Sequence, residues 1–548
     1  MANDNPEEKH DSDDLNIGGG YAKYVLAVLV LVYVFNFIDR QILSILAEDI
    51  KADLGITDAQ IGFLYGTAFA VFYAVFGIPL GRLADVWVRK NLISIGLMFW
   101  SAMTALSGTA RGFTSLAVYR IGVGVGEASA TPAAFSMLSD YFPPKLRTTA
   151  LGIYSSGVYI GAGIGIFLGG VILDAWNGAF PDPATSPFGL KGWHVAFFTV
   201  GLPGLVMAIW VWTLKEPKRG QSEGMVSVAN PHPFRETWLE LQAILPFFNL
   251  ASLYRLQAGS KGLLLNVAIA IGCALVFYGL YLWLGNAAQW TALGIGVYCA
   301  FSWAQGLARR DPATFAMIFK CRTLIYFLIG MPCFAFIGYG AGFWAAPFFL
   351  RVHGVSAAET GTVLGLSAAL GGWLGVSFGA IAADKLRQYT VRGKLYVAIS
   401  AVILSLPMVI MLLLTDDLIT AYIFNFLFAL LSPMWLGPGA ATINDLVLPR
   451  MRAIASAFYL MMITFIGLAL GPFMMGQISD AFIATGSDSG EGLRLGMLWG
   501  LSMAVPSVML IFMAILNIEK DEASRLERAR AAGEVIDPAS VAQANALS

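Results

Sequence analysis

The sequence has few charged residues. Asp, Glu, Lys and Arg make up 13% of its 548 residues, against about 25% in a typical soluble protein. Apolar residues make up 57% and occur in long runs, such as 262–284, which contains no Asp or Glu and no Lys or Arg. A helix of that length crosses a hydrocarbon core of ~30 Å. The shortage of charge therefore excludes a large soluble protein and predicts an all-α integral membrane protein.

Cysteine and histidine are also scarce, with four residues of each. The cysteines lie in or beside apolar runs without metal-ligand spacing, so we expect them to pack as small apolar residues. The Lys and Arg residues form no basic stripe, which argues against nucleic acid as a partner. The glycines at 122, 124 and 126 lie inside a predicted membrane helix with no preceding strand, so they are no dinucleotide motif. We expect no cofactor, no metal and no enzymatic activity.

Apolar runs separated by charged residues predict fourteen membrane helices. Their expected ranges are 22–46, 58–81, 91–110, 114–139, 148–173, 194–214, 262–284, 289–308, 322–350, 358–383, 394–414, 418–445, 453–477 and 493–517. The expected organisation is a disordered cytoplasmic N-terminus (1–21), an N-terminal six-helix bundle (22–218), a cytoplasmic connector (219–261), an inserted transmembrane hairpin (262–310), a C-terminal six-helix bundle (311–518) and a cytoplasmic tail (519–548).

The two bundles are expected because the chain repeats itself. Asp140 to Arg147 matches Asp445 to Arg452 at an offset of 305, and Gly165…Asp174 matches Gly471…Asp480 at an offset of 306. Internal duplication is typical of transporters whose substrate site lies near mid-membrane between the repeats. The hairpin has no counterpart in the repeat, so we expect peripheral packing. In the amphipathic part of the connector, the expected membrane-interface residues are Trp238, Leu241, Leu245 and Phe248.

Basic residues predict the orientation. With a cytoplasmic N-terminus, the short inner loops hold fifteen Lys and Arg residues and the outer side holds five. Cytoplasmic loops carry such an excess. Both termini are therefore expected in the cytoplasm, which requires an even number of spans.

Four charged residues remain inside predicted membrane helices: Asp39, Arg40, Arg120 and Glu127. An ionised group there costs several kcal/mol, so it should face a cavity and have a partner. A substrate that competes for an Arg would change the proton affinity of the neighbouring carboxylate. The favoured interpretation is a substrate and proton-coupling site, and the alternative is a structural ionic clamp. Pairing of Asp39 or Glu127 with Arg40 or Arg120 would nearly neutralise the group. Of the two bases, Arg120 is the expected anion partner, whereas Arg40, ~100° from Asp39 on its helix, is free to face a packing interface.

The loop Gly81-Arg-Leu-Ala-Asp85-Val-Trp-Val-Arg89-Lys90 resembles the signature loop of the major facilitator superfamily. Val86, Val88 and, in the second copy, Ala380 depart from the family pattern. The resemblance implies a major facilitator fold and an inner gate, in which Arg89 contacts Asp140 and Asp85 contacts the start of the helix after Arg452. The implied gate residues are Asp85, Arg89, Lys90, Asp140 and Arg147, with second-half counterparts Asp384, Asp445 and Arg452. The alternative is that these charges only hold the loop at the inner surface.

The segments Asn36 to Ser44 and Arg120 to Ser129 resemble the Spinster-like branch of this superfamily. The resemblance implies a secondary transporter in a bacterial inner membrane, with Asp39, Arg120 and Glu127 lining a central cavity. It also implies an amphipathic or lipid-like substrate, with proton coupling as an open question. Two alternatives remain: an organic-anion/proton symporter, and a non-transporting membrane sensor or lipid scramblase.

Overall fold

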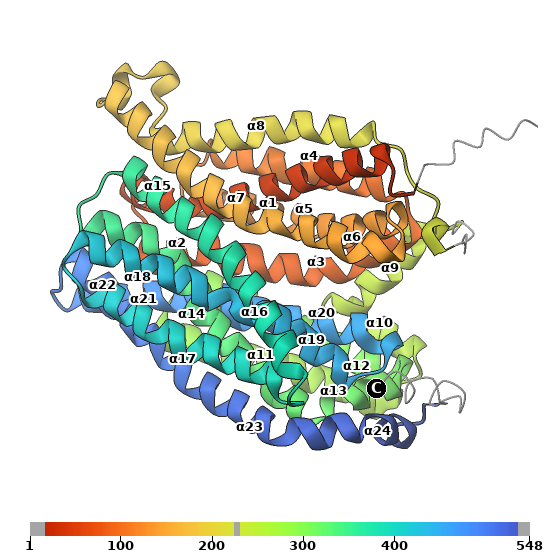
Figure 1. Cartoon of the computed structure of the whole chain (residues 1–548). Helices are drawn as coiled ribbons and strands as arrows, with labels where there is room; N and C mark the ends of the chain where they lie inside the picture. Colours follow the sequence, from red (N-terminus) through yellow and green to blue (C-terminus); the bar gives the residue numbers. More distant parts are fainter. Residues whose placement is uncertain (1–16, 224–230, 535–548) are drawn as a thin grey trace, which may run out of the picture.

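The computed structural model describes residues 17–223 and 231–534, and the regular structure of these residues is helical (Figure 1). Most of the predicted N-terminal segment and the last part of the predicted tail lie outside the described residues. The predicted tail begins at 519, but α23 continues to Ala523 and a further short helix follows it.

The N-terminal bundle occupies the upper half of Figure 1. Its helices are α1 (Gly20–Leu54), α2 (Asp58–Tyr65), α3 (Thr67–Val86), α4 (Arg89–Ser107), α5 (Phe113–Glu127), α6 (Ala130–Tyr141), α7 (Pro144–Ala179) and α8 (Gly192–Trp212), with short turns η1 (Pro183–Thr185) and η2 (Pro187–Gly189) before α8. The glycines of α7 face α1: a Cβ on Gly161 would lie 2.4 Å from the Val34 carbonyl oxygen, and one on Gly165 would lie 2.9 Å from the Ile38 Cα. The expected close packing of this helix is therefore present.

The C-terminal bundle occupies the lower half of the same view (Figure 1). Its helices are α14 (Arg322–Val352), α15 (Ala357–Leu366), η4 (Ser367–Gly371), α16 (Gly372–Arg387), α17 (Gly393–Leu414), α18 (Leu418–Leu431), η5 (Ser432–Trp435), α19 (Leu436–Leu446), η6 (Pro449–Met451), α20 (Arg452–Met462), η7 (Ile463–Ala469), α21 (Gly471–Ala484), α22 (Ser489–Gly500), η8 (Leu501–Met503), α23 (Ala504–Ala523) and α24 (Arg525–Ala531). Turns η4 and η7 are π-helical, and both lie where this bundle faces the other one. Such turns are frequent at functional positions in helices.

All fourteen predicted segments coincide with helices. Within the described residues, eleven helices are long and apolar enough to cross a membrane. The three other predicted spans correspond to α4, to α5 with α6, and to α12, which carry more polar residues or are interrupted at Ala128 and Ser129. The total of fourteen spans stays a prediction.

The segment between the bundles contains η3 (Gln221–Glu223), α9 (Pro233–Ile244), α10 (Phe248–Arg255), α11 (Gly259–Leu284), α12 (Ala287–Arg310) and α13 (Pro312–Phe319). Trp238 and Phe248 are about half exposed, and their membrane-interface role stays a prediction. Helix α11 is almost entirely exposed, as peripheral packing requires. Helix α12 differs, because it packs against α3 of one bundle and η7 of the other.

The first described residues lie at the same end of the bundle as α6 and α24, since the Gly18 N–H donates to the Tyr141 carbonyl. This end is called the inner end below, following the predicted orientation. The orientation itself stays a prediction.

Candidate substrate and coupling site

The structure brings together the four charged residues predicted inside the membrane. Asp39 and Arg40 come from α1, and Arg120 and Glu127 come from α5. Asp39, Arg120 and Glu127 are fully buried, and Arg40 is 8% exposed. The cluster holds two acids and two bases, so its formal charges balance.

Arg40, not Arg120, forms the ion pair of this cluster. Its Nη2 lies 2.6 Å from Glu127 Oε2. The guanidinium also stacks on three aromatic rings, with its carbon 4.7 Å, 4.3 Å and 5.3 Å from the ring centres of Phe37, Phe69 and Tyr73. In this structure Glu127 therefore pairs with Arg40 and not with Arg120, the expected anion partner, and Arg40 faces the charge cluster and not a packing interface. The positions of Glu127 on α5 and of Phe69 and Tyr73 on α3 around Arg40 decide this, and sequence spacing along α1 does not contain them.

The other two charges contact each other less directly. Arg120 Nη1 donates to the backbone carbonyl of Asp39 over 3.2 Å. The Asp39 carboxylate lies near the Thr104 hydroxyl and the Trp100 indole N–H, yet neither of its oxygens makes a hydrogen bond of good geometry. One oxygen of Glu127 and Nη2 of Arg120 also lack partners. Buried polar atoms without partners are rare, and they mark places where a ligand or water belongs.

The C-terminal bundle has no charged counterparts of the α5 residues. At the offset of 305, Arg120 corresponds to Asn425 and Glu127 corresponds to Ser432. The charges of the site therefore come from one repeat, on α1 and α5.

At the inner end of the N-terminal bundle, the contact predicted between Arg89 and Asp140 is present. Arg89 Nη1 lies 2.5 Å from Asp140 Oδ2, and its Nε lies 2.7 Å from Glu216 Oε1. Arg89 also donates to Ser136 Oγ and to the Pro217 carbonyl, and it is fully buried. Sequence reasoning missed Glu216, whose only signal was an acid directly after a membrane helix. A gating role for these residues stays a prediction.

The second repeat has an equivalent pair. Lys394 Nζ lies 2.5 Å from Asp445 Oδ2. Lys394 and Asp445 stand 305 residues after Arg89 and Asp140, so the repeat offset could have identified Lys394. Arg525 of α24 donates to the Asp445 carbonyl and thereby covers the end of α19.

The remaining predicted gate residues make local contacts. Lys90 Nζ donates to the Trp212 carbonyl, Arg147 to Ser222 Oγ, and Arg452 to the Asn444 carbonyl. Within the described chain, no hydrogen bond joins the exposed Asp85 to the start of α20, so that predicted contact is absent in this structure. The second-half Asp384 is likewise exposed.

A separate polar cluster lies at the inner end of the C-terminal bundle. Arg450 Nη1 lies 2.6 Å from Asp311 Oδ2, and Arg450 also pairs with Glu534. Partial burial raises the pKa of Asp311, but hydrogen bonds from Arg450 and Thr314 outweigh it and bring this pKa to about 2. The cluster ties the start of α20 to the segment after the hairpin and to the C-terminal helix.

At the outer end, an ion-pair network joins the two bundles. Arg351 of α14 donates to both oxygens of Asp58 over 2.6 Å and 2.8 Å, and to Glu48 Oε1 over 2.7 Å. Asp58 is fully buried and also contacts Lys51. Removal of this network would leave buried charges without partners, so it stabilises outer closure.

Two aspartates add a symmetric closure at the same end. Asp480 accepts hydrogen bonds from the backbone N–H groups of Asp58 and Ala59, over 3.0 Å and 2.8 Å, at the start of α2 in the opposite bundle. Asp174 accepts one from Ala358 at the start of α15, over 2.7 Å. Asp174 and Asp480 are the residues matched by the repeat. Sequence reasoning found the match but not its role, because the partner amides belong to the other bundle. Each carboxylate caps a helix start, where an anion is favoured.

These features define the architecture of a two-bundle membrane protein: two repeated bundles, a buried charge cluster and ion pairs between the bundles at the outer end. A family model described as Major Facilitator Superfamily matches residues 29–472, and the chain belongs to this family.

Similar proteins agree with the Spinster-like resemblance. A crystal structure of a bacterial homolog of the human lysosomal transporter Spinster, inward-facing and occupied, aligns with a TM-score of 0.67 at 25% identity, over 92% of this chain and 98% of that one. An MFS-type efflux pump of Mycolicibacterium smegmatis is 24% identical over 87% of this chain and 89% of its own length. Protein spinster homolog 1 of Bos taurus is 24% identical over 85% and 74%. The chain is therefore a Spinster-like, multi-pass membrane transporter of the superfamily, and not an enzyme.

Proposed function

We propose that the protein moves a small amphipathic or lipid-like organic solute by alternating access, in a bacterial inner membrane with both termini in the cytoplasm. The observation that carries the proposal is the Arg40–Glu127 ion pair, set among aromatic rings beside a buried carboxylate without hydrogen bonds. Aromatic faces suit an apolar body, and the guanidinium suits an anionic group.

The same pair supplies a route to proton coupling. An anionic substrate group that binds Arg40 separates it from Glu127. A carboxylate that loses its cation in a buried place binds a proton more readily. Substrate and proton would then occupy the site together. Closure of the inner end would then involve the Arg89–Asp140 and Lys394–Asp445 pairs.

An organic-anion/proton symporter is the second candidate. The probable L-galactonate transporter of Escherichia coli is 29% identical over 33% of this chain, and the hexuronate transporter of Bacillus subtilis is 30% identical over 35%. Sugar acids carry the carboxylate that Arg40 would bind. A scramblase would move lipid without any need for a proton gradient.

The test measures transport in proteoliposomes, with and without a pH gradient, for lysophospholipid, sphingoid phosphate and hexuronate. The variants are Glu127→Gln and Asp39→Asn, and the control is Asp416→Asn, whose side chain is 92% exposed. We expect Glu127→Gln to retain exchange at equal pH but to lose the acceleration by the gradient, while the control behaves as wild type. An equal response of all proteins to the gradient would show that these carboxylates do not couple protons.

A further inference from the structure

The two bundles meet along two lines of helix contact, here called seams, and the two seams differ in the residues that fill them. One seam runs between α3 and η7, and the other runs between α7 and the segment α15, η4 and α16. In a two-bundle transporter, each seam is a place where a lipid chain could pass between the bilayer and the site. The residues that fill the two seams can be compared directly.

Helix α12 of the hairpin covers the first seam from its outer end to beyond mid-height. Near the outer end, the Thr67 hydroxyl bonds to Gln289 of α12 over 2.6 Å. At mid-height, Gly296 fits between Val71 of one bundle and Phe465 of the other, since a Cβ there would lie 2.9 Å and 3.2 Å from their side chains. Nearer the inner end, Trp303 stacks on Phe458.

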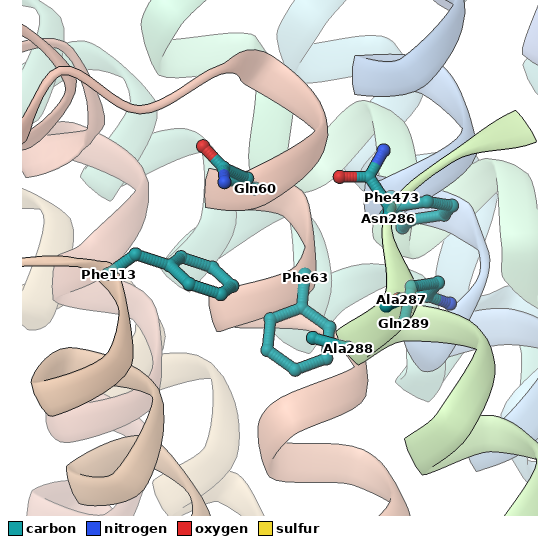
Figure 2. Close-up of a pocket in the computed structure, with 8 residues that line it drawn as sticks. All are labelled: Gln60, Phe63, Phe113, Asn286, Ala287, Ala288, Gln289 and Phe473. Atoms are coloured by element: carbon teal, nitrogen blue, oxygen red, sulfur yellow. The ribbon is translucent and has the colours of Figure 1, made fainter. Parts of the chain in front are cut away.

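The remaining inner part of this seam is covered by the connector. Phe234 of α9 contacts Trp87 at the end of α3, and Arg82 pairs with Glu236. At the outer end, the residues in Figure 2 surround a cavity of about 90 Å³, formed by α2, α5, the first turn of α12 and α21. Its lining includes the amides of Gln60, Asn286 and Gln289, which do not suit a lipid chain.

The second seam is closed only in its outer half. There Gly163 lies against Gly365 and Gly170 lies against Ala357, while Tyr159 covers Gly372 at the level where the groove begins. Nearer the inner end, α7 and α16 separate around a cavity of about 590 Å³, the α7–α16 groove. Ile153, Leu370 and Trp373 line it and are each about half exposed.

The depth and charge of the groove fit one chain of an inner-leaflet lipid. Its α7 side extends from Thr149 to Ile160, ~16 Å at ~1.5 Å per residue, about half of a hydrocarbon core of ~30 Å. Toward the inner end, α7 begins with the exposed Lys145 and α16 ends with the exposed Lys385, so each of these two helices carries a cation on that side of the groove. Two cations beside an apolar groove complement an anionic head group.

We infer that the hairpin closes the α3–η7 seam to lipid, so that a single-chain anionic lipid reaches the space between the bundles from one side only, along the α7–α16 groove. This inference rests on the proposed function and deepens it. It also gives α12 a role that peripheral packing would not require.

The test is photo-labelling of the full chain in nanodiscs with a single-chain lipid phosphate that carries a diazirine at the end of its chain. We expect saturable labelling within 149–160 and 367–373, and none within 67–86 or 463–469. The variant Gly152→Trp fills the groove, because a Cβ at Gly152 meets nothing within 4 Å. It should reduce the saturable labelling at least fivefold. The control Gly272→Trp places the same side chain on α11, at a glycine with equally open surroundings, and should leave labelling unchanged.

Two results would overturn the inference: saturable labelling of α3 and η7 at the level of the groove, or full labelling in Gly152→Trp. Transport of the same lipid in proteoliposomes separates the two proposals. Lipid transport with labelling on the wrong seam refutes the one-sided route alone, whereas groove labelling without transport refutes the proposed function alone.

Discussion

Removal of the Asp480 carboxylate should open the outer end of the transporter. Asp480 accepts two hydrogen bonds at the start of α2, and both cross between the bundles. Loss of an N-cap costs ~1 kcal/mol and up to ~2 kcal/mol. Because 1.4 kcal/mol is about tenfold in an equilibrium, Asp480→Ala should raise the ratio of outer-open to outer-closed molecules ~5- to 30-fold.

Pulsed electron–electron double resonance can measure the ratio of outer-open to outer-closed molecules. Spin labels at exposed Arg111 and Thr485 report the distance between the bundles at the outer end. The four cysteines form no disulfide and can be replaced beforehand. The matched control is Asp488→Ala, since Asp488 caps Gly490 and Glu491 within its own bundle. The control should lower stability without a change in the distance distribution. An unchanged distribution in Asp480→Ala, or an equal change in the control, would refute the capping mechanism.

Two further substitutions test the same structure. Gly170→Ala places a Cβ 2.1 Å from the Ala357 carbonyl oxygen, so it should favour the outer-open state in the spin-label measurement; Gly178→Ala, on the same helix with open surroundings, should not. At the inner end, Arg89→Ala should lower the free energy of unfolding in detergent by ~3–5 kcal/mol, because it leaves two acids without their buried cation. The equivalent Lys394→Ala, which breaks one partly exposed pair, should cost ~1 kcal/mol or less, and equal losses would contradict this explanation.

Local properties of the chain predicted much of the fold. Apolar run length predicted where the helices lie, and the repeat predicted two bundles, because both depend only on residues close in sequence or at a constant offset. The same offset pointed to Asp174 and Asp480, and applied to Arg89 it would have reached Lys394. Hydropathy marks eleven of the fourteen predicted spans in the described chain, since polar residues in α4, α5 and α12 weaken the signal there.

Contacts between distant helices could not be predicted in this way. Sequence spacing suggested that Arg40 could turn away from the site, yet its side chain pairs with Glu127 of α5 and stacks on three aromatic rings. The hairpin was expected at the periphery because the repeat is complete without it. Its second helix instead bridges both bundles, which depends on one glycine between two side chains.

The sequence by itself determined that the protein is a membrane transporter with four charges inside its helices, because the cost of charge in a bilayer makes such residues rare and conspicuous. The tertiary structure alone decided which charges pair, which aspartates close the outer end and which seam the hairpin covers. Those outcomes depend on helix rotation and on the approach of two bundles, and neither is encoded in the spacing of residues along one helix.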